Sequence, residues 1–206
     1  MTPARCAATV LLAVLTAVAP ARADKPASPR GQAHLQVGGK PAEGGGWKGG
    51  GWVEVDYGRP LLRGRSNIFG GGADAGTLVN GGAPVWRLGA NEATRLKTEV
   101  ALNLGGKKVA PGEYALFAEV KDGAWTLIVS TQPTQGLGEG KAKGKIWGSY
   151  GYDAKYDVVR APLALSKSNV SEEELTISFV DVTAAGAKLQ IAWEHTVATA
   201  AIAFDK

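Results

Sequence analysis

Short runs in which apolar and polar residues alternate constrain this chain more than any other feature. From Leu96 to Leu104, every second residue (Leu96, Thr98, Val100, Leu102, Leu104) falls on one face, and Lys97, Glu99 and Asn103 fall on the other. A period of two is the side-chain period of a β-strand. Comparable short runs rich in strand-forming residues occur at Trp52–Tyr57, Tyr114–Ala118, Trp125–Val129, Asp157–Ala161, Leu175–Phe179, Lys188–Trp193 and Val197–Phe204.

Turn residues separate these runs. Gly105-Gly106 follows one run, Pro111-Gly112 has the residues of a type II turn, and Lys121-Asp-Gly123 has those of a hairpin. Ser171–Glu174 imitates a helix capping box, but alternation resumes at once, so at most one helical turn is expected. The sequence therefore predicts an all-β fold, an antiparallel β-sandwich or jelly-roll-like domain of about eight or nine strands. The segment Gln132–Tyr152 is predicted to be a long surface loop.

The first 23 residues have the layout of a secretory signal peptide. Met1–Arg5 is basic, Cys6–Ala19 is almost wholly apolar, and Ala21–Ala23 fits a small-x-small cleavage site. The apolar run is too short to remain as a membrane anchor. We therefore expect an exported chain, periplasmic or secreted, with no integral membrane segment after cleavage.

Two further divisions follow from composition. Residues 24–51 are rich in glycine, proline, lysine and alanine, which predicts a flexible tether, with His34–Val37 as a weak strand candidate. Residues 52–206 are long enough to form a single domain with its own core. The boundaries predicted are thus a signal peptide at 1–23, a tether at 24–51 and one β-domain at 52–206.

Charge and cysteine content exclude several classes of function. Signal cleavage would remove Arg5 and Arg22, so the 23 basic residues become 21 against 19 acidic ones, a net charge of +2. No basic block is present that would suggest nucleic acid or an anionic membrane as a partner. Cys6, the one cysteine, lies in the signal, which excludes disulfides, thiolate catalysis and cysteine metal sites from the mature chain. No cofactor motif is present, and the glycine runs lack the context of a phosphate-binding loop.

The densest group of polar residues lies between Tyr57 and Thr94. It contains the candidate ligand-binding residues Arg59, Arg65, Trp86, Arg87, Asn91 and Glu92. Guanidinium groups bind carboxylate, sulfate or phosphate with two parallel hydrogen bonds, and an Asn adds a donor and an acceptor. Trp86 is expected to form a floor or a cation–π partner for an arginine. This inventory suits a small anionic, polar or saccharide ligand.

Two other interpretations of the same residues stay open. An arginine paired with Glu92, together with Asn91 in an Asx turn, would fasten two loops of a disulfide-free domain. Alternatively, Glu92 is the acid/base of a hydrolase or lyase that acts on a saccharide or acyl substrate, with an arginine stabilising negative charge. Against catalysis, the mature chain has only His34 and His195, no GxSxG elbow, and no histidine or cysteine spacing for a metal. The sequence names no catalytic or metal-binding residue.

Several segments resemble a known family. YGRP, a GR that precedes IFG, WRxGANEAT, PGEYALF and YDxxxD are similar to the bacterial family called domain of unknown function 2911. The resemblance covers Val53 to Phe204 and implies an exported β-rich domain without an assigned activity. The chain departs from that pattern in the glycine-rich segment GGGADAGTLVNGGAPV, Gly70–Val85. This insertion either lengthens a loop at the rim of a site or is a neutral expansion.

Overall fold

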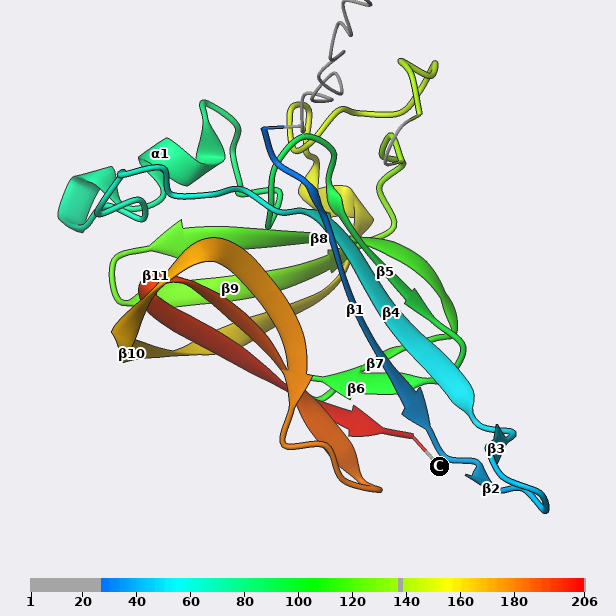
Figure 1. The fold of residues 1–206 in the computed structure, drawn as a ribbon. Coiled ribbons are helices and arrows are strands. Elements are labelled where there is room, and N and C mark those ends of the chain that lie inside the picture. The colour runs from blue at the N-terminus through cyan, green and yellow to red at the C-terminus, as the bar shows by residue number, and fades with distance from the viewer. Residues whose placement is uncertain (1–26, 137–138, 206) are drawn as a thin grey trace, which may run out of the picture.

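The computed structural model describes residues 27–136 and 139–205, and it confirms the all-β antiparallel class (Figure 1). One sheet holds nine strands in the order β1-β4-β5-β8-β9-β10-β11-β6-β7. Their bounds are β1 Arg30–Val37, β4 Gly51–Gly58, β5 Thr94–Thr98, β6 Leu102–Leu104, β7 Lys107–Val109, β8 Gly112–Lys121, β9 Ala124–Ser130, β10 Asp157–Val180 and β11 Gly186–Phe204. A small hairpin, β2 Lys40–Pro41 with β3 Trp47–Lys48, and three short helical turns, η1 Gly72–Asp74, α1 Thr77–Asn80 and η2 Ala154–Tyr156, complete the described elements.

Two long strands make the sheet continuous and strongly curved. The first part of β10 pairs with β9, and the later part pairs only with β11. The far part of β10 also approaches the segment after β4, where Leu61 forms a bridge with Glu174. The sheet therefore bends back toward its own first strands. The specific two-sheet sandwich arrangement stays a prediction, because nine of the eleven described strands join one sheet.

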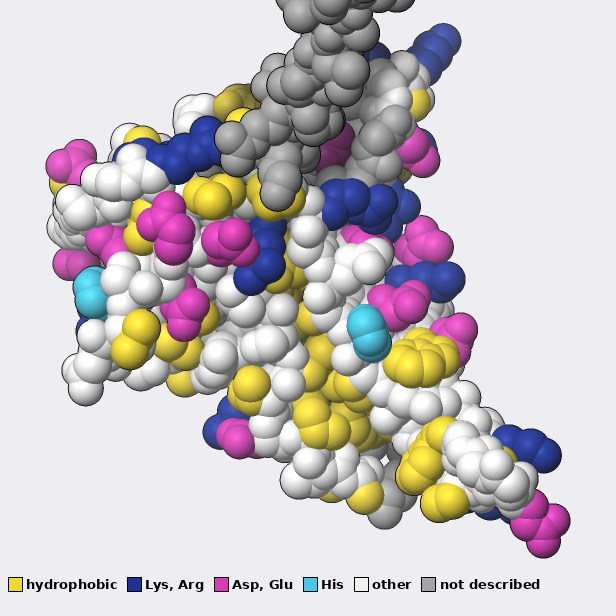
Figure 2. All heavy atoms as spheres, in the orientation of Figure 1, with side chains coloured by type: hydrophobic (Ala, Val, Ile, Leu, Met, Phe, Trp, Pro, Cys, Tyr) yellow, Lys and Arg dark blue, Asp and Glu magenta, His cyan; other side chains and the backbone are white. Residues whose placement is uncertain are grey.

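The concave side of this sheet holds the core. The inward residues of β4 (Val53, Val55 and Tyr57) are all buried, as the alternation predicts. Figure 2 shows hydrophobic side chains in the seam between the β10–β11 side and the β1–β4 side of the molecule. Trp125 and Trp193 are buried in this core, as expected for aromatic residues in alternating strands.

The run Leu96–Leu104 is predicted as one strand, but in the structure it forms two strands that pair with different neighbours. β5 pairs with β4 and β8, whereas β6 pairs with β11 and β7 near the far end of the sheet order. The break has a local cause, since the Thr98 hydroxyl donates to the Val100 carbonyl at 2.6 Å and accepts from the Val100 amide at 3.3 Å. A side chain that bonds its own backbone in this way turns the strand aside. Alternation continues across the break because both strands face the same core.

Within the predicted tether, Arg30–Val37 forms a strand, which includes the weak strand candidate His34–Val37. This segment is β1, which pairs antiparallel with β4 along its full length, from Arg30 opposite Gly58 to Val37 opposite Gly51. Ala33 and Leu35 are buried, whereas the alternate positions are exposed. Polar Gln and His on the exposed face gave the segment a low average hydrophobicity, which hid a half-buried strand. The predicted signal peptide lies outside the described residues.

Two long connections lie at one end of the sheet, the upper end in Figure 1. One runs from β4 to β5 and carries η1 and α1, and the other runs from β9 to β10 and carries η2. The second connection confirms the expected long loop after Gln132. Within the residues that the structure describes, no helix is both long and apolar enough to cross a membrane.

Candidate functional site

Four of the six candidate residues line one cavity of about 290 Å³ at this loop-bearing end. Arg65, Trp86, Arg87 and Asn91 contribute to its wall, together with Trp147 and Trp193. The wall also includes Leu78 and Val79, from within or beside α1 in the glycine-rich insertion. The insertion therefore does form part of the rim of a concave site.

Arg87 is held in a fixed position by its own loop and by the β9–β10 connection. Its Nη1 donates to the Asn91 carbonyl at 2.8 Å. Its guanidinium carbon lies 4.9 Å from the ring centre of Trp147 and 5.4 Å from that of Tyr150. These two rings are parallel within 8°. A guanidinium that stacks on aromatic rings keeps its edge donors available to a ligand.

Arg65 is fixed in a comparable way on the other part of the wall. Its Nε donates to the Leu62 carbonyl at 3.0 Å, and its Nη2 donates to the Leu61 carbonyl at 2.7 Å. Its guanidinium carbon lies 5.9 Å from the Trp193 ring centre. Both cavity arginines therefore use carbonyl oxygens and aromatic rings as neighbours.

The charge of these two arginines is uncompensated among the described residues. Neither forms an ion pair there, and no Asp or Glu lines the cavity. Carbonyl dipoles orient a guanidinium without cancelling its full positive charge. The cavity is therefore a preorganised positive site with aromatic walls.

A cluster of aromatic rings forms the base of the site. Trp86 is 1% exposed and stacks on Trp193, with ring planes 16° apart and centres 6.4 Å apart. Phe69 packs against both, and Trp125 lies behind it at 4.5 Å. Trp86 acts as a floor, as expected, but its indole is not the cation–π partner of Arg87. That role falls to Trp147 and Tyr150.

The loop that supplies Trp147 is fastened to the opposite loop by two hydrogen bonds. The buried hydroxyl of Ser149 donates to the Val85 carbonyl at 2.7 Å, and the Tyr150 hydroxyl donates to the Gly81 carbonyl at 2.7 Å. Trp147 and Tyr150 nevertheless remain 44% and 42% exposed. Trp147 lies 60 residues after Arg87 in the sequence, so no local pattern links the two residues.

Arg59 and Glu92 lie apart from this group. Arg59 forms an ion pair with Glu174 at 2.9 Å and donates to the Leu175 carbonyl and the Thr176 hydroxyl, both at 3.1 Å. It therefore fastens the end of β4 to β10. Glu92 does not line the cavity, and its side chain has no hydrogen bond or ion pair within residues 27–136 and 139–205. The expected Arg–Glu92 pair does not form there.

The close packing of the GANEAT backbone against YGRP explains the glycine at position 58. Asn91 adopts a left-handed conformation, with φ 64°, which Asn tolerates better than most residues. The Ala90 amide donates to the Gly58 carbonyl at 3.1 Å, and a Cβ on Gly58 would lie 1.9 Å from the Ala90 carbonyl oxygen. The buried Thr94 hydroxyl donates to the Leu88 carbonyl at 2.9 Å. YGRP and GANEAT are thus two sides of one tightly packed corner.

A family model described as protein of unknown function (DUF2911) matches residues 46–202. The chain belongs to the DUF2911 family. No curated protein and no solved structure matches the chain. The quoted segments that resemble this family therefore belong to it, and in this DUF2911 domain YGRP and WRLGANEAT form the corner that carries the cavity.

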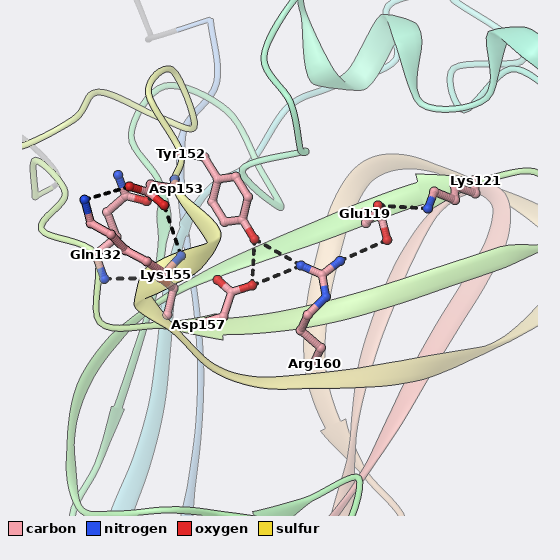
Figure 3. A network of polar contacts seen from close by, with 9 residues as sticks. Glu119, Lys121, Gln132, Tyr152, Asp153, Lys155, Asp157 and Arg160 are labelled. Atoms are coloured by element: carbon pink, nitrogen blue, oxygen red, sulfur yellow. Dashed lines mark hydrogen bonds and ion pairs between the residues drawn. The ribbon is translucent and has the colours of Figure 1, made fainter.

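A second polar group in the DUF2911 domain involves the YDxxxD segment (Figure 3). Tyr152 donates to Asp157 at 2.7 Å, and Arg160 donates to Tyr152 and to Asp157, both at 3.0 Å. Arg160 also reaches Glu119 at 2.9 Å, and Lys121 lies 3.0 Å from the same carboxylate. Figure 3 shows these side chains in a row from the β9–β10 connection across to β8.

The contacts within this row of side chains shift the pKa values of Tyr152 and Glu119. Burial, and then the hydrogen bond to Asp157, raise the pKa of the Tyr152 hydroxyl above its usual range. The hydrogen bond from Lys121 lowers the pKa of Glu119. The Asp157 side chain is only 8% exposed, and its Oδ1 has no partner among the described residues. Within those residues of the DUF2911 domain, no group of three or more His, Cys, Asp or Glu side chains is placed to hold a metal ion.

Proposed function

We propose that this protein is a non-catalytic binding module of the cell envelope that recognises a small anionic ligand, of which an acidic saccharide is the class best matched. The observation that carries the proposal is a pair of arginines, Arg65 and Arg87, that have no ion pair among the described residues and lie in one aromatic-walled cavity. Export to the periplasm or beyond, expected from the first 23 residues, is part of the proposal.

The chemistry of the wall supports an acidic ring. A carboxylate or sulfate can accept two hydrogen bonds from a guanidinium edge. Trp147 offers an exposed aromatic surface beside Arg87, on which an apolar sugar face can rest. The cavity of about 290 Å³ is near the lower end of the range for small-molecule sites, so it suits one or two rings.

The position of Glu92 argues against using it as an acid/base in this cavity. Acid/base catalysis by Glu92 would require its carboxylate within hydrogen-bond reach of the reacting atom. Glu92 lies outside the lining, and no other Asp or Glu belongs to it. Binding, rather than hydrolysis, is the function that the cavity wall supports.

Titration calorimetry with a uronic-acid oligosaccharide tests the proposal, with the carboxyl-reduced, neutral oligosaccharide as the comparison. We expect the acidic form to bind at least tenfold more tightly, a difference of about 1.4 kcal/mol or more. Arg87→Gln should weaken binding of the acidic form by about tenfold or more, since it removes a charge-assisted contact. Trp147→Ala should weaken both forms.

Arg30→Gln is the matched control. Arg30 is an exposed arginine on β1 that pairs with Asp56 at 3.1 Å, and it does not line the cavity. Its replacement should leave the affinity unchanged. Equal affinity for the acidic and neutral forms, or an unchanged affinity in a folded Arg87→Gln variant, would remove the basis for an anion site.

A further inference from the structure

A second cavity, of about 350 Å³, shares no lining residue with the first. Four segments that are separate in the sequence form it. They are the loop after Phe69, the β8–β9 turn at Lys121–Gly123, and the paired strands β10 and β11 at Lys167 and Thr196. Convergence of separate segments on one concavity is typical of binding sites.

Lysines dominate the charge of this cavity. Lys167 donates to the Thr196 hydroxyl at 3.0 Å and has no ion pair within residues 27–136 and 139–205. Lys121 pairs with Glu119, and Arg160, which shares that carboxylate, also pairs with Asp157. Among the described residues, the lining holds two lysines and one acidic residue, Asp122. This excess of one positive charge in the lining favours an anion.

The floor of the cavity is aromatic. Phe69 and Trp125 both line it, and their ring centres are 4.5 Å apart. They are nearly buried, so a ligand would meet their remaining exposed edges. An apolar, planar group gains from such contacts because aromatic rings favour edge-to-face and offset packing.

A bulge in the sheet shapes this position. Lys167 pairs with Thr196, and the next pair is Glu172 with Glu194, so the four residues 168–171 of β10 face the single residue 195 of β11. His195 Nδ1 contacts the Ser168 carbonyl at 3.0 Å across the bulge. Bulges redirect side chains and are common beside active or binding sites. Here the bulge lies directly after Lys167.

The same bulge fixes the loop that separates the two cavities. Glu194 has a left-handed backbone, with φ 54°, and its carboxylate accepts hydrogen bonds from the amides of Asn67 and Ile68. These two residues immediately precede Phe69. The loop is thereby held with Ile68 toward the first cavity and Phe69 toward the second.

We propose that the second cavity binds a planar apolar ring that bears one anionic group. The anion lies between Lys167 and the Thr196 hydroxyl, with Lys121 on the facing wall, and the ring rests on Trp125 and Phe69. No residue lines both cavities, although Phe69 of the second packs against Trp86 and Trp193 of the first.

Phenyl phosphate is the probe that tests this site, with inorganic phosphate and phenol as its two halves. In the full chain, we expect saturable binding of phenyl phosphate, followed by calorimetry and by the NMR shift of the Trp125 indole N–H. Each half should bind at least tenfold more weakly. Lys167→Met, which keeps an apolar chain of similar length, should weaken phenyl phosphate binding by about tenfold.

Two variants serve as controls. Lys188→Met removes an exposed lysine that pairs with Asp181, and Arg87→Gln alters only the first cavity. Both should bind phenyl phosphate as the wild type does. The proposal is overturned if the wild type does not bind the probe, if the Trp125 signal does not move, or if Arg87→Gln weakens binding as much as Lys167→Met does.

Discussion

At the scale of single residues, three arginines from one stretch of sequence have different roles because their neighbours differ. Arg59 meets a carboxylate, Glu174, whereas Arg65 and Arg87 meet carbonyls and aromatic rings. Arg59 therefore fastens the end of β4 to β10, and Glu174 compensates most of its positive charge. Arg65 and Arg87 keep their positive charge facing a cavity. The identity of the partner, more than the residue type, decides between stability and binding.

Tyr152 provides a prediction for alkaline pH. Because its pKa is raised in the folded state, the tyrosine stays protonated there while the unfolded chain ionises from about pH 10 upward. Its contribution to stability is complete below that pH and is lost as the pH rises toward the folded-state pKa. The measurement is the free energy of unfolding in urea between pH 8 and 11, roughly the range around a tyrosine pKa near 10. Over this range, Tyr152→Phe should lose less stability with rising pH than the wild type. Parallel curves would contradict this origin.

At the scale of elements, the loop between β4 and β5 is a partition with a cavity on each side. Its position depends on Glu194, whose carboxylate accepts hydrogen bonds from the backbone amides of Asn67 and Ile68. A Gln at position 194 offers one neutral acceptor oxygen, so both amides would lose a charged partner and one of them would lose its acceptor.

Glu194→Gln should therefore loosen this loop before it affects the sheet. We expect faster amide hydrogen exchange at Asn67 and Ile68, because the free energy of local opening there falls by on the order of 1–2 kcal/mol. Amides of β8 and β9 should keep their protection. Glu113→Gln, an exposed β8 residue paired with Arg95, is the control and should leave the loop unchanged. Unaltered exchange at Ile68 in Glu194→Gln would show that the carboxylate does not hold the loop.

Strand positions could be predicted from sequence because they depend on local alternation. The order of strands could not, since it depends on partners. Leu96–Leu104 shows the limit of such a prediction, because one alternating run forms two strands that lie far apart in the strand order. The candidate site divides in the same way. Arg65, Trp86, Arg87 and Asn91 were found within one polar stretch, but Trp147 comes from a loop more than 50 residues later.

At the scale of the whole molecule, β1 extends the domain beyond the predicted boundary at Trp52. It covers one edge of β4 and buries Ala33 and Leu35. A chain that starts at Gly38 should unfold with a free energy lower by on the order of 3 kcal/mol than one that starts at Ala27, from the lost apolar burial. Urea unfolding measures the difference. Equal free energies of unfolding for the two chains would show that Arg30–Val37 does not stabilise the domain.

The strand order also has a consequence for when the chain can fold. β10 and β11 join β9 on one side to β6 on the other, although they come last in the sequence. The hairpin of β6 and β7 therefore has no neighbour until β11 has been synthesised. Contacts of such long sequence separation form slowly, because the intervening chain must first be closed into a loop. The part of the sheet that contains β6 and β7 is thus completed after β1, β4, β5 and β8, whose sheet neighbours all precede β10.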